Sequence, residues 1–243
     1  MSQLPITIKN FANGHQALTV RTNGHIDPAA IVASLNLPAC SRLLLISGGA
    51  GQMSPEMMEH LSDLFAVVGE VVAKYNATVI DGGTQSGVMQ LMGEALAKTG
   101  KSITQIGVLP AYAEAGPKLQ AEDILEPHHS NFVLVEGYMW GDEVETMYKL
   151  ANYFSTRVPS VTLLINGGAI ALHEIEWNVR QGREVVVLAG SGRLADEIAE
   201  AIRYPESNVR DRIATIIREG HITIFDIASP PQELGRLLEQ RLS

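Results

Sequence analysis

The sequence is poor in cysteine and in long apolar runs. Its single cysteine, Cys40, cannot form a disulfide within the chain, which fits a reducing compartment. The apolar runs at residues 43–46 and 185–189 are far shorter than the roughly 20 residues that a membrane-spanning helix needs. The first residues lack the charged-then-apolar pattern of a secretory signal. These absences predict a cytoplasmic protein with no membrane partner.

Basic residues are also scarce. The chain holds 18 Lys and Arg against 27 Asp and Glu, which gives a formal net charge of −9. No basic run of the kind that binds a phosphate backbone is present, so we expect no nucleic-acid partner. A small anion can still bind, because a few donors and one arginine can make a site positive within an acidic protein. Any anion site must therefore be sought locally.

The chain does contain a recurring unit of a buried strand, a glycine-containing turn and an amphipathic helix. The unit occurs five times and is clearest at residues 78–89, where a β-branched run ends at paired glycines and helical spacing begins. This pattern predicts an α/β fold: a single Rossmann-like domain with a mostly parallel sheet and helices on both faces. We expect one domain over residues 1–243, with a leader at 1–41, a core at 42–203 and a C-terminal helix-strand-helix at 204–243.

Three segments outside the repeat have weaker patterns. The leader is expected to form two short strands and a short helix after Asp27, which can cap it. Residues 111–127 show no clean periodicity and predict a long surface loop over one end of the sheet. Residues 205–220 predict a helix.

The glycine turns form the candidate ligand site. Right-handed crossovers place them at one edge of the sheet, where open α/β sheets bind ligands. Uncovered backbone N–H groups and helix N-termini suit a phosphate or another anion. The candidate ligand-binding residues are Gly48, Gly49, Ala50, Gly51, Gly82, Gly83, Thr84, Ser86, Gly87, Val88, Trp140, Gly141, Asn166, Gly167, Gly168, Gly190, Ser191, Gly192 and Arg193.

Each of these features also has a plain structural explanation. A glycine turn can simply fit the backbone, without any ligand. Arg193 can form an ion pair with Asp142 or Asp196 instead of holding a phosphate. Trp140 can stack on a base, or it can pack in the core or in an interface. At this stage both explanations stay open.

Metal and nucleophile chemistry find less support. His128 and His129 are adjacent, so we expect their side chains to point apart, and the chain has no His-Glu-x-x-His and no cysteine pair. We expect no metal site and no required cofactor. His173 and Glu174 are the acid/base candidates, because they lie one turn into the helix that follows Gly167-Gly168. Alternatively, both side chains lie on the solvent-exposed face of the helix and have no catalytic role.

Several separate motifs resemble the SLOG superfamily, specifically its prokaryotic LSDAT group. The motifs are residues 81–89 (DGGTQSGVM), 125–132 (LEPHHSNF), 165–168 (INGG) and 190–196 (GSGRLAD), within a match of about residues 42–203. The LSDAT group is similar to the N-terminal homology region of melastatin-type TRP channels. The resemblance implies a Rossmann-like domain for a nucleotide-derived ligand such as ADP-ribose, NAD or an AMP-like nucleotide. It also implies ligand contacts at Ser86, Trp140 and Arg193.

The same superfamily includes LOG and lysine-decarboxylase-like proteins, which resemble this chain more distantly. LOG-type phosphoribohydrolases carry Pro-Gly-Gly-x-Gly-Thr-x-x-Glu, where residues 166–174 read NGGAIALHE. Glu174 is kept, whereas Ile170 and Ala171 replace the second Gly-Thr, which counts against hydrolysis of a ribosyl bond. We therefore predict a nucleotide-binding or sensing domain. The alternatives are an N-glycosidic hydrolase that uses Glu174 and His173, and a structural assembly module with a vestigial pocket. A homo-oligomer, dimeric or larger, is expected in each case.

Overall fold

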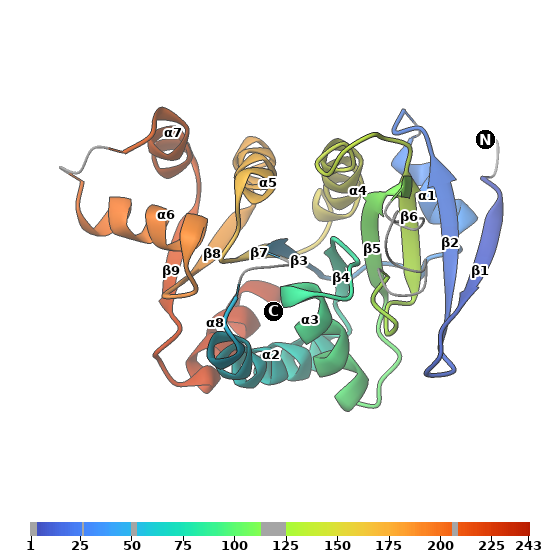
Figure 1. Cartoon of the computed structure of the whole chain (residues 1–243), viewed down its shortest axis with the longest axis horizontal. Helices are drawn as coiled ribbons and strands as arrows, with labels where there is room; N and C mark the ends of the chain where they lie inside the picture. Colours follow the sequence, from blue (N-terminus) through green and yellow to red (C-terminus); the bar gives the residue numbers. More distant parts are fainter. Residues whose placement is uncertain (1–3, 26, 50–52, 113–124, 206–208) are drawn as a thin grey trace.

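The computed structural model describes residues 4–25, 27–49, 53–112, 125–205 and 209–243. Strands and helices alternate along most of this length (Figure 1). The strands are β1 (Ile6–Asn10), β2 (Gln16–Thr22), β3 (Leu43–Gly48), β4 (Thr78–Asp81), β5 (Gln105–Pro110), β6 (Asn131–Val135), β7 (Ser160–Ile165), β8 (Glu184–Ala189) and β9 (Ile222–Asp226). The helices are α1 (Pro28–Ser34), α2 (Pro55–Tyr75), α3 (Gly87–Lys98), α4 (Val144–Ser155), α5 (Ala169–Arg180), α6 (Arg193–Arg203), α7 (Asp211–Glu219) and α8 (Pro231–Leu242).

All the strands of the described residues belong to one nine-stranded sheet with the order β1-β2-β6-β5-β4-β3-β7-β8-β9. Every neighbouring pair is parallel except β1 and β2, which are antiparallel. The chain adds β4 and β5 on one side of β3 and later adds β7 and β8 on the other side. The direction of winding therefore reverses between β3 and β7, and ligands of open α/β sheets bind in the crevice at such a point.

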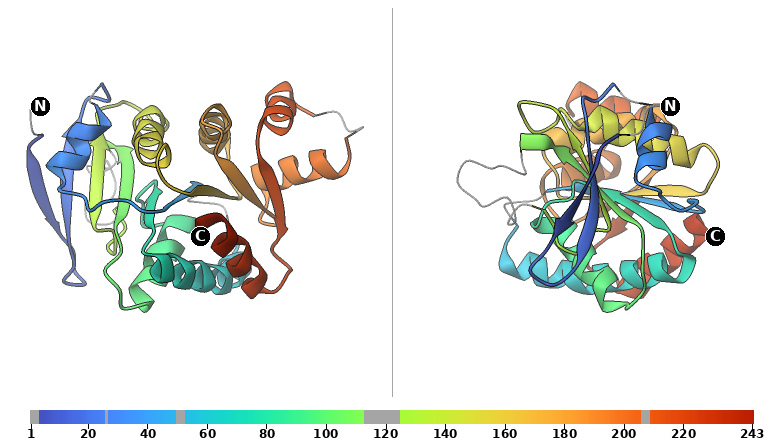
Figure 2. Two further views of the ribbon diagram at one scale, coloured as in Figure 1. Left: turned by 180° about the vertical axis from the view of Figure 1, so that it is seen from behind. Right: turned by 90° about the vertical axis from the view of Figure 1, so that its right-hand side faces the viewer.

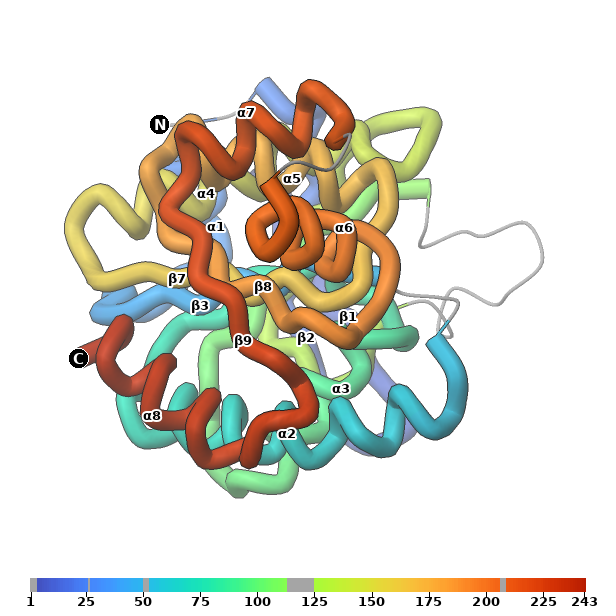
Figure 3. Tube along the Cα trace, turned by 90° about the vertical axis from the view of Figure 1, so that its left-hand side faces the viewer, coloured from blue at the N-terminus to red at the C-terminus, as the bar shows by residue number. Residues whose placement is uncertain are grey.

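Helices cover both faces of the sheet, as the alternating pattern predicts (Figure 2). On one face α2 packs between α3 and α8, and the other face carries α1, α4, α5, α6 and α7. Figure 3 shows β9 at the near edge of the sheet, between the α6–α7 pair and α8. Apolar side chains fill both layers, because the central strands are buried on both faces and read as continuous hydrophobic runs. Among the described residues, no helix combines the length and the apolar character needed to cross a bilayer.

Local signals explain where the longest helix begins and ends. Ser54 caps α2 by accepting a hydrogen bond from the Met57 N–H at 3.2 Å, and Pro55 occupies the first turn, where its missing N–H is not needed. Asn76 ends the helix in the left-handed conformation at φ +50°. The apolar side of α2, which includes Leu61 and Phe65, is buried in the core.

The outer segments differ in part from the expectations. The two leader strands and the helix capped by Asp27 are confirmed, and β2 joins the central sheet by pairing with β6. The helix expected from residue 205 is wrong at its start, because α7 begins only at Asp211. Arg210 has an extended backbone at ψ 137°, which fixes that boundary. Most of the loop predicted at 111–127 lies outside the described residues.

Candidate functional site

The turns that follow β3 and β7 touch at the carboxyl edge of the sheet. A Cβ atom on Gly48 would lie 2.4 Å from the carbonyl oxygen of Ile165, and one on Gly49 would lie 2.9 Å from Asn166 Oδ1. Real Cβ atoms essentially never approach other atoms this closely. Glycine therefore permits the two strand ends to come together at the point where the winding reverses.

The turns after β7 and β8 are tied to each other through Asn166 and Ser191. Asn166 adopts φ +55°, and its Nδ2 donates to the Ser191 carbonyl at 2.8 Å. The backbone N–H of Asn166 donates to Ser191 Oγ at 2.8 Å, and that hydroxyl donates to the Leu188 carbonyl at 2.6 Å. Both side chains are buried. Their hydrogen bonds fix the conformation of the two turns.

Arg193 lies at the surface where these turns meet. It is the first residue of α6 and adopts φ +51°, a conformation that side-chain-bearing residues seldom take. Its guanidinium covers Gly168, since a Cβ atom there would lie 2.6 Å from Arg193 Nη2. The carboxylates of Asp142 and Asp196 accept hydrogen bonds from backbone N–H groups of their own turns. Within the described part of the chain, Arg193 forms no ion pair with them or with another residue.

Four helices begin at this edge without a side-chain cap: α3, α4, α5 and α6. Their N-cap residues are Ser86, Glu143, Gly168 and Gly192. In α6 the Leu194 and Ala195 N–H groups donate to the carbonyls of Gly167 and Asn166, at 3.3 and 3.0 Å, whereas no side chain caps the first N–H groups of α5. Each helix end carries a partial positive charge. Two of these ends, those of α5 and α6, flank the Arg193 guanidinium. This arrangement suits an anionic group.

The turn after β4 brings small residues and hydroxyls to the same edge. The hydroxyls of Thr84 and Ser86 lie 3.3 Å apart at the start of α3, and Gly87 adopts φ +55°. A Cβ atom on Gly83, at φ +64°, would lie 2.8 Å from Gly107 Cα. Close packing of this turn on β5 therefore requires glycine.

A buried charged cluster holds that turn from below. His129, with its side chain fully buried, places Nε2 2.7 Å from Asp81 Oδ1 and Nδ1 2.8 Å from Glu126 Oε2. Burial lowers the pKa of His129, but the charges and hydrogen bonds of Asp81 and Glu126 outweigh it and raise the pKa to about 9. The imidazole is therefore a cation at neutral pH, between two carboxylates. Asp81 Oδ1 also accepts the Gly83 N–H at 2.7 Å, which fixes the turn.

His128 and His129 do not point apart as we expected. His128 Nδ1 lies 2.6 Å from Glu126 Oε1, so both imidazoles contact the two oxygens of one carboxylate. Burial of Glu126 raises its pKa, yet the hydrogen bonds and charge of His129 and the contacts of His128 lower it overall. The described residues contain no group of three or more His, Cys, Asp or Glu placed to hold a metal ion. The cluster is an ion-pair network.

Trp140 lies on the loop between β6 and α4, next to the start of α5. Its side chain is 43% exposed, and its ring meets the Tyr112 ring edge-on, with the ring centroids 6.0 Å apart. The loop lies against α5 at Gly141, which adopts φ +107°, since a Cβ atom there would be in ordinary contact with Ile170 Cγ1 at 3.8 Å. One aromatic face is therefore presented beside the N-terminus of α5.

Glu174 and His173 are separated by the helix that carries them. Glu174 is buried on the sheet side of α5, and its Oε2 accepts a hydrogen bond from Ser47 Oγ at 2.5 Å. Burial raises the pKa of Glu174 to about 7; the Ser47 bond opposes this shift and the charges of Glu143 and Asp81 add to it. His173 is half exposed, and its Nδ1 lies 3.5 Å from Glu176 Oε2. The structure therefore does not pair the two predicted acid/base residues.

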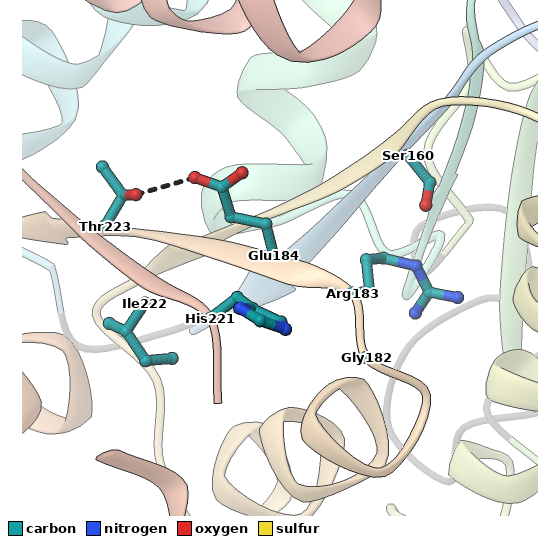
Figure 4. Close-up of a pocket in the computed structure, with 7 residues that line it drawn as sticks. All are labelled: Ser160, Gly182, Arg183, Glu184, His221, Ile222 and Thr223. Carbon is teal, nitrogen blue, oxygen red and sulfur yellow. Dashed lines mark hydrogen bonds between the residues drawn. The ribbon is translucent and has the colours of Figure 1, made fainter. Parts of the chain in front are cut away.

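A pocket of about 510 Å³ lies at the opposite, amino edge of the sheet (Figure 4). It contains none of the predicted site residues. Figure 4 shows Glu184 directed toward Thr223, whose hydroxyl donates to it at 2.7 Å, and Arg241 Nε also contacts that carboxylate at 2.7 Å. The Glu184 carboxylate therefore already has hydrogen-bond partners within the protein, and the pocket holds none of the predicted site residues. For these two reasons we place the candidate site at the carboxyl edge.

The structure brings most of the predicted residues to this edge. Ala50 and Gly51 lie outside the described residues, and the Val88 side chain is fully buried in the core. Gly82 and Gly190 belong to turns at this edge. Sequence reasoning missed the roles of Ser47, Tyr112, Glu126 and His129. For Glu126 and His129 a signal existed, because a Glu followed by two His within three residues offers charges that can pair.

Known proteins with similar sequences identify the family of this chain. Residues 41–235 match the family described as SLOG in TRPM, prokaryote. The transient receptor potential cation channel subfamily M member 2 of Mus musculus is 28% identical over 206 residues, which are 68% of this chain and 14% of the channel. The Rattus norvegicus protein of the same name is 27% identical over 209 residues, again 14% of its length. The chain thus spans a small part of these relatives, and it belongs to the prokaryotic SLOG-in-TRPM family.

Proposed function

We propose that the carboxyl edge of the sheet binds a nucleotide-derived small molecule such as ADP-ribose, NAD or an AMP-like nucleotide. One observation carries the proposal: the exposed Arg193 guanidinium, without an ion pair among the described residues, lies between the N-termini of α5 and α6. A fixed cation beside the uncapped end of α5, with the dipole of α6 behind it, forms an attraction for a phosphate.

The other groups at this edge divide the site into two parts. The phosphate is assigned to Gly167, Gly168, Gly192 and Arg193. The half-exposed ring of Trp140, beside the start of α5, offers a face on which a base can stack. A recognition role also suits a chain that matches only 14% of a cation channel.

Replacing Arg193 with alanine should weaken binding of ADP-ribose or NAD by about 1.5–3 kcal/mol, the worth of a charge-assisted hydrogen bond to phosphate. Isothermal titration calorimetry against ADP-ribose, NAD, AMP, cyclic nucleotides and cytokinin riboside monophosphates measures this directly. Arg193→Lys keeps the charge but loses the planar fork, so we expect an intermediate affinity.

Arg218→Ala is the matched control for this experiment. Arg218 is also exposed and at one end of a helix, but it contacts Glu219 on α7, away from the glycine turns. Its removal should leave the affinity unchanged. An Arg193→Ala variant that binds as tightly as the wild type would remove Arg193 from the site.

The buried Glu174 supports a second candidate function, hydrolysis of an N-glycosidic bond. A carboxyl whose pKa is about 7 can donate or accept a proton at neutral pH. Release of free base from a nucleotide, lost in Glu174→Gln, would support this activity. Absence of release at high protein concentration, together with a ligand-induced thermal shift, would leave a binding protein.

Self-association is part of the same proposal. Native mass spectrometry of the purified protein would report the oligomer and any nucleotide retained from the cell. An oligomer that retains no nucleotide and gives no thermal shift with the panel would favour the structural assembly module instead.

A further inference from the structure

Glu174 lies less than two turns into α5, the helix whose N-cap Gly168 belongs to the proposed anion site. Its carboxyl is hydrogen-bonded to Ser47 at 2.5 Å, and Ser47 is the residue that precedes Gly48 at the end of β3. The Glu174 side chain projects from α5, the helix whose N-terminus carries Gly168 and the Arg193 contact. Only 8% of the residue is exposed. An anion on the turns above therefore acts on this carboxyl through a poorly hydrated interior.

No cation compensates Glu174 within the described part of the chain. The charged groups that act on it are acids: Glu143 at the start of α4 and Asp81 at the end of β4. From α4 it also faces Tyr148, which is neutral because burial, above all, holds its pKa well above the usual value. The cation before β8, Arg183, donates instead to Asn178 at 2.8 Å.

The remaining charged side chains of α5 and α7 are directed elsewhere. On α5, Glu176 contacts His173 and accepts two hydrogen bonds from Arg212 of α7. These side chains are partly or largely exposed, whereas Glu174 is buried. Glu174 is therefore faced by two acids and a neutral tyrosine, and of the two acids Asp81 is itself paired with the His129 cation at 2.7 Å.

A buried carboxyl in such surroundings holds its proton unusually well. Burial is the main cause, and the charges of Glu143 and Asp81 add to it against the hydrogen bond from Ser47, so that the pKa of Glu174 is about 7. A new negative charge nearby strengthens the preference for the protonated form. Among the described residues, no ion pair joins Arg193 to Glu174.

We propose that binding of an anionic ligand at the carboxyl edge is coupled to the uptake of a proton by Glu174. This inference rests on the proposed function. Because the bound state holds more protons than the free state, affinity falls as the pH rises. The limit of this effect is about tenfold per pH unit for one proton. The site would then respond to pH in the neutral range.

Calorimetry of ADP-ribose binding at about pH 7.5, in PIPES, HEPES and Tris, tests the coupling. ADP-ribose is the suitable probe, because its diphosphate lacks the second ionisation near pH 6 of a phosphate monoester. The apparent enthalpy should vary with the ionisation enthalpy of the buffer, with a slope that shows proton uptake. Glu174→Gln, which cannot titrate, should bind ADP-ribose with a slope near zero. Its affinity should stay within about twofold from pH 6.5 to 8.5, while that of the wild type falls several-fold.

Glu176→Gln is the control on the same helix, and it should keep the proton uptake of the wild type. Binding of ADP-ribose without proton uptake overturns the inference and leaves the proposed function intact. Uptake that persists in Glu174→Gln also overturns it, because another group then takes the proton. If none of the nucleotides binds, the proposed function fails and the coupling fails with it.

Discussion

Replacing His129 with alanine should lower the free energy of unfolding by about 3–5 kcal/mol, the cost of removing one partner from a buried ion pair. The imidazolium lies between Asp81 and Glu126, at 2.7 Å and 2.8 Å. Alanine would leave two carboxylates buried without their cation and would open a cavity beside Phe132, on which the imidazole stacks. Urea unfolding followed by circular dichroism at neutral pH measures the loss.

His221→Ala is the control for this experiment. His221 is exposed and immediately precedes β9, and its removal should change stability by less than about 0.5 kcal/mol. A loss of under about 1 kcal/mol in His129→Ala would contradict a charged role for His129. The pH dependence offers a second check. The folded pKa of His129 is raised from 6.5 to about 9, so its contribution is complete below pH 6.5 and is lost as the pH rises through 9.

The fold could be predicted from the sequence because its signals are local. The β-branched run 78–80, the glycines at 82–83 and the helical spacing from residue 88 mark a strand, a turn and a helix within twelve residues. Parallel pairing then follows from chain order and crossover handedness. The prediction was wrong at residue 205, where the apolar spacing of the following helix was extended back across Pro205, although α7 begins at Asp211. The helical spacing of apolar residues does not by itself locate the first residue of a helix.

The interior of the candidate site could not be predicted, because its contacts join residues far apart in the sequence. Asp81 and His129 are 48 positions apart, and Ser47 and Glu174 are 127 positions apart. Each of these polar residues could equally well lie exposed on the surface, and the neighbouring sequence does not show whether it is buried or exposed. The glycine turns were predictable for the opposite reason, since a turn is a property of adjacent residues.

The contribution of Glu174 to the stability of the wild-type protein should fall as the pH rises from about 4.5 to about 7, and Glu174→Gln should abolish it. The pKa of Glu174 rises from 4.5 to about 7 on folding, chiefly through burial, so between these values the folded state holds a proton that the unfolded state has released. The shift corresponds to about 3 kcal/mol, complete above the folded pKa. Urea unfolding of both proteins at several pH values tests this, because other titrating groups cancel in the difference.

Glu176→Gln supplies a control of opposite sign. The hydrogen bonds from Arg212 lower the pKa of Glu176, so its contribution is present at neutral pH and is lost as the pH falls through the folded value. Relative to the wild type, Glu176→Gln should therefore become less stable as the pH rises, whereas Glu174→Gln should become more stable. A stability difference between Glu174→Gln and the wild type that does not change with pH would show that Glu174 ionises normally in the folded protein. In that case the carboxyl beneath Gly48 could neither take up a proton on ligand binding nor act as an acid at neutral pH.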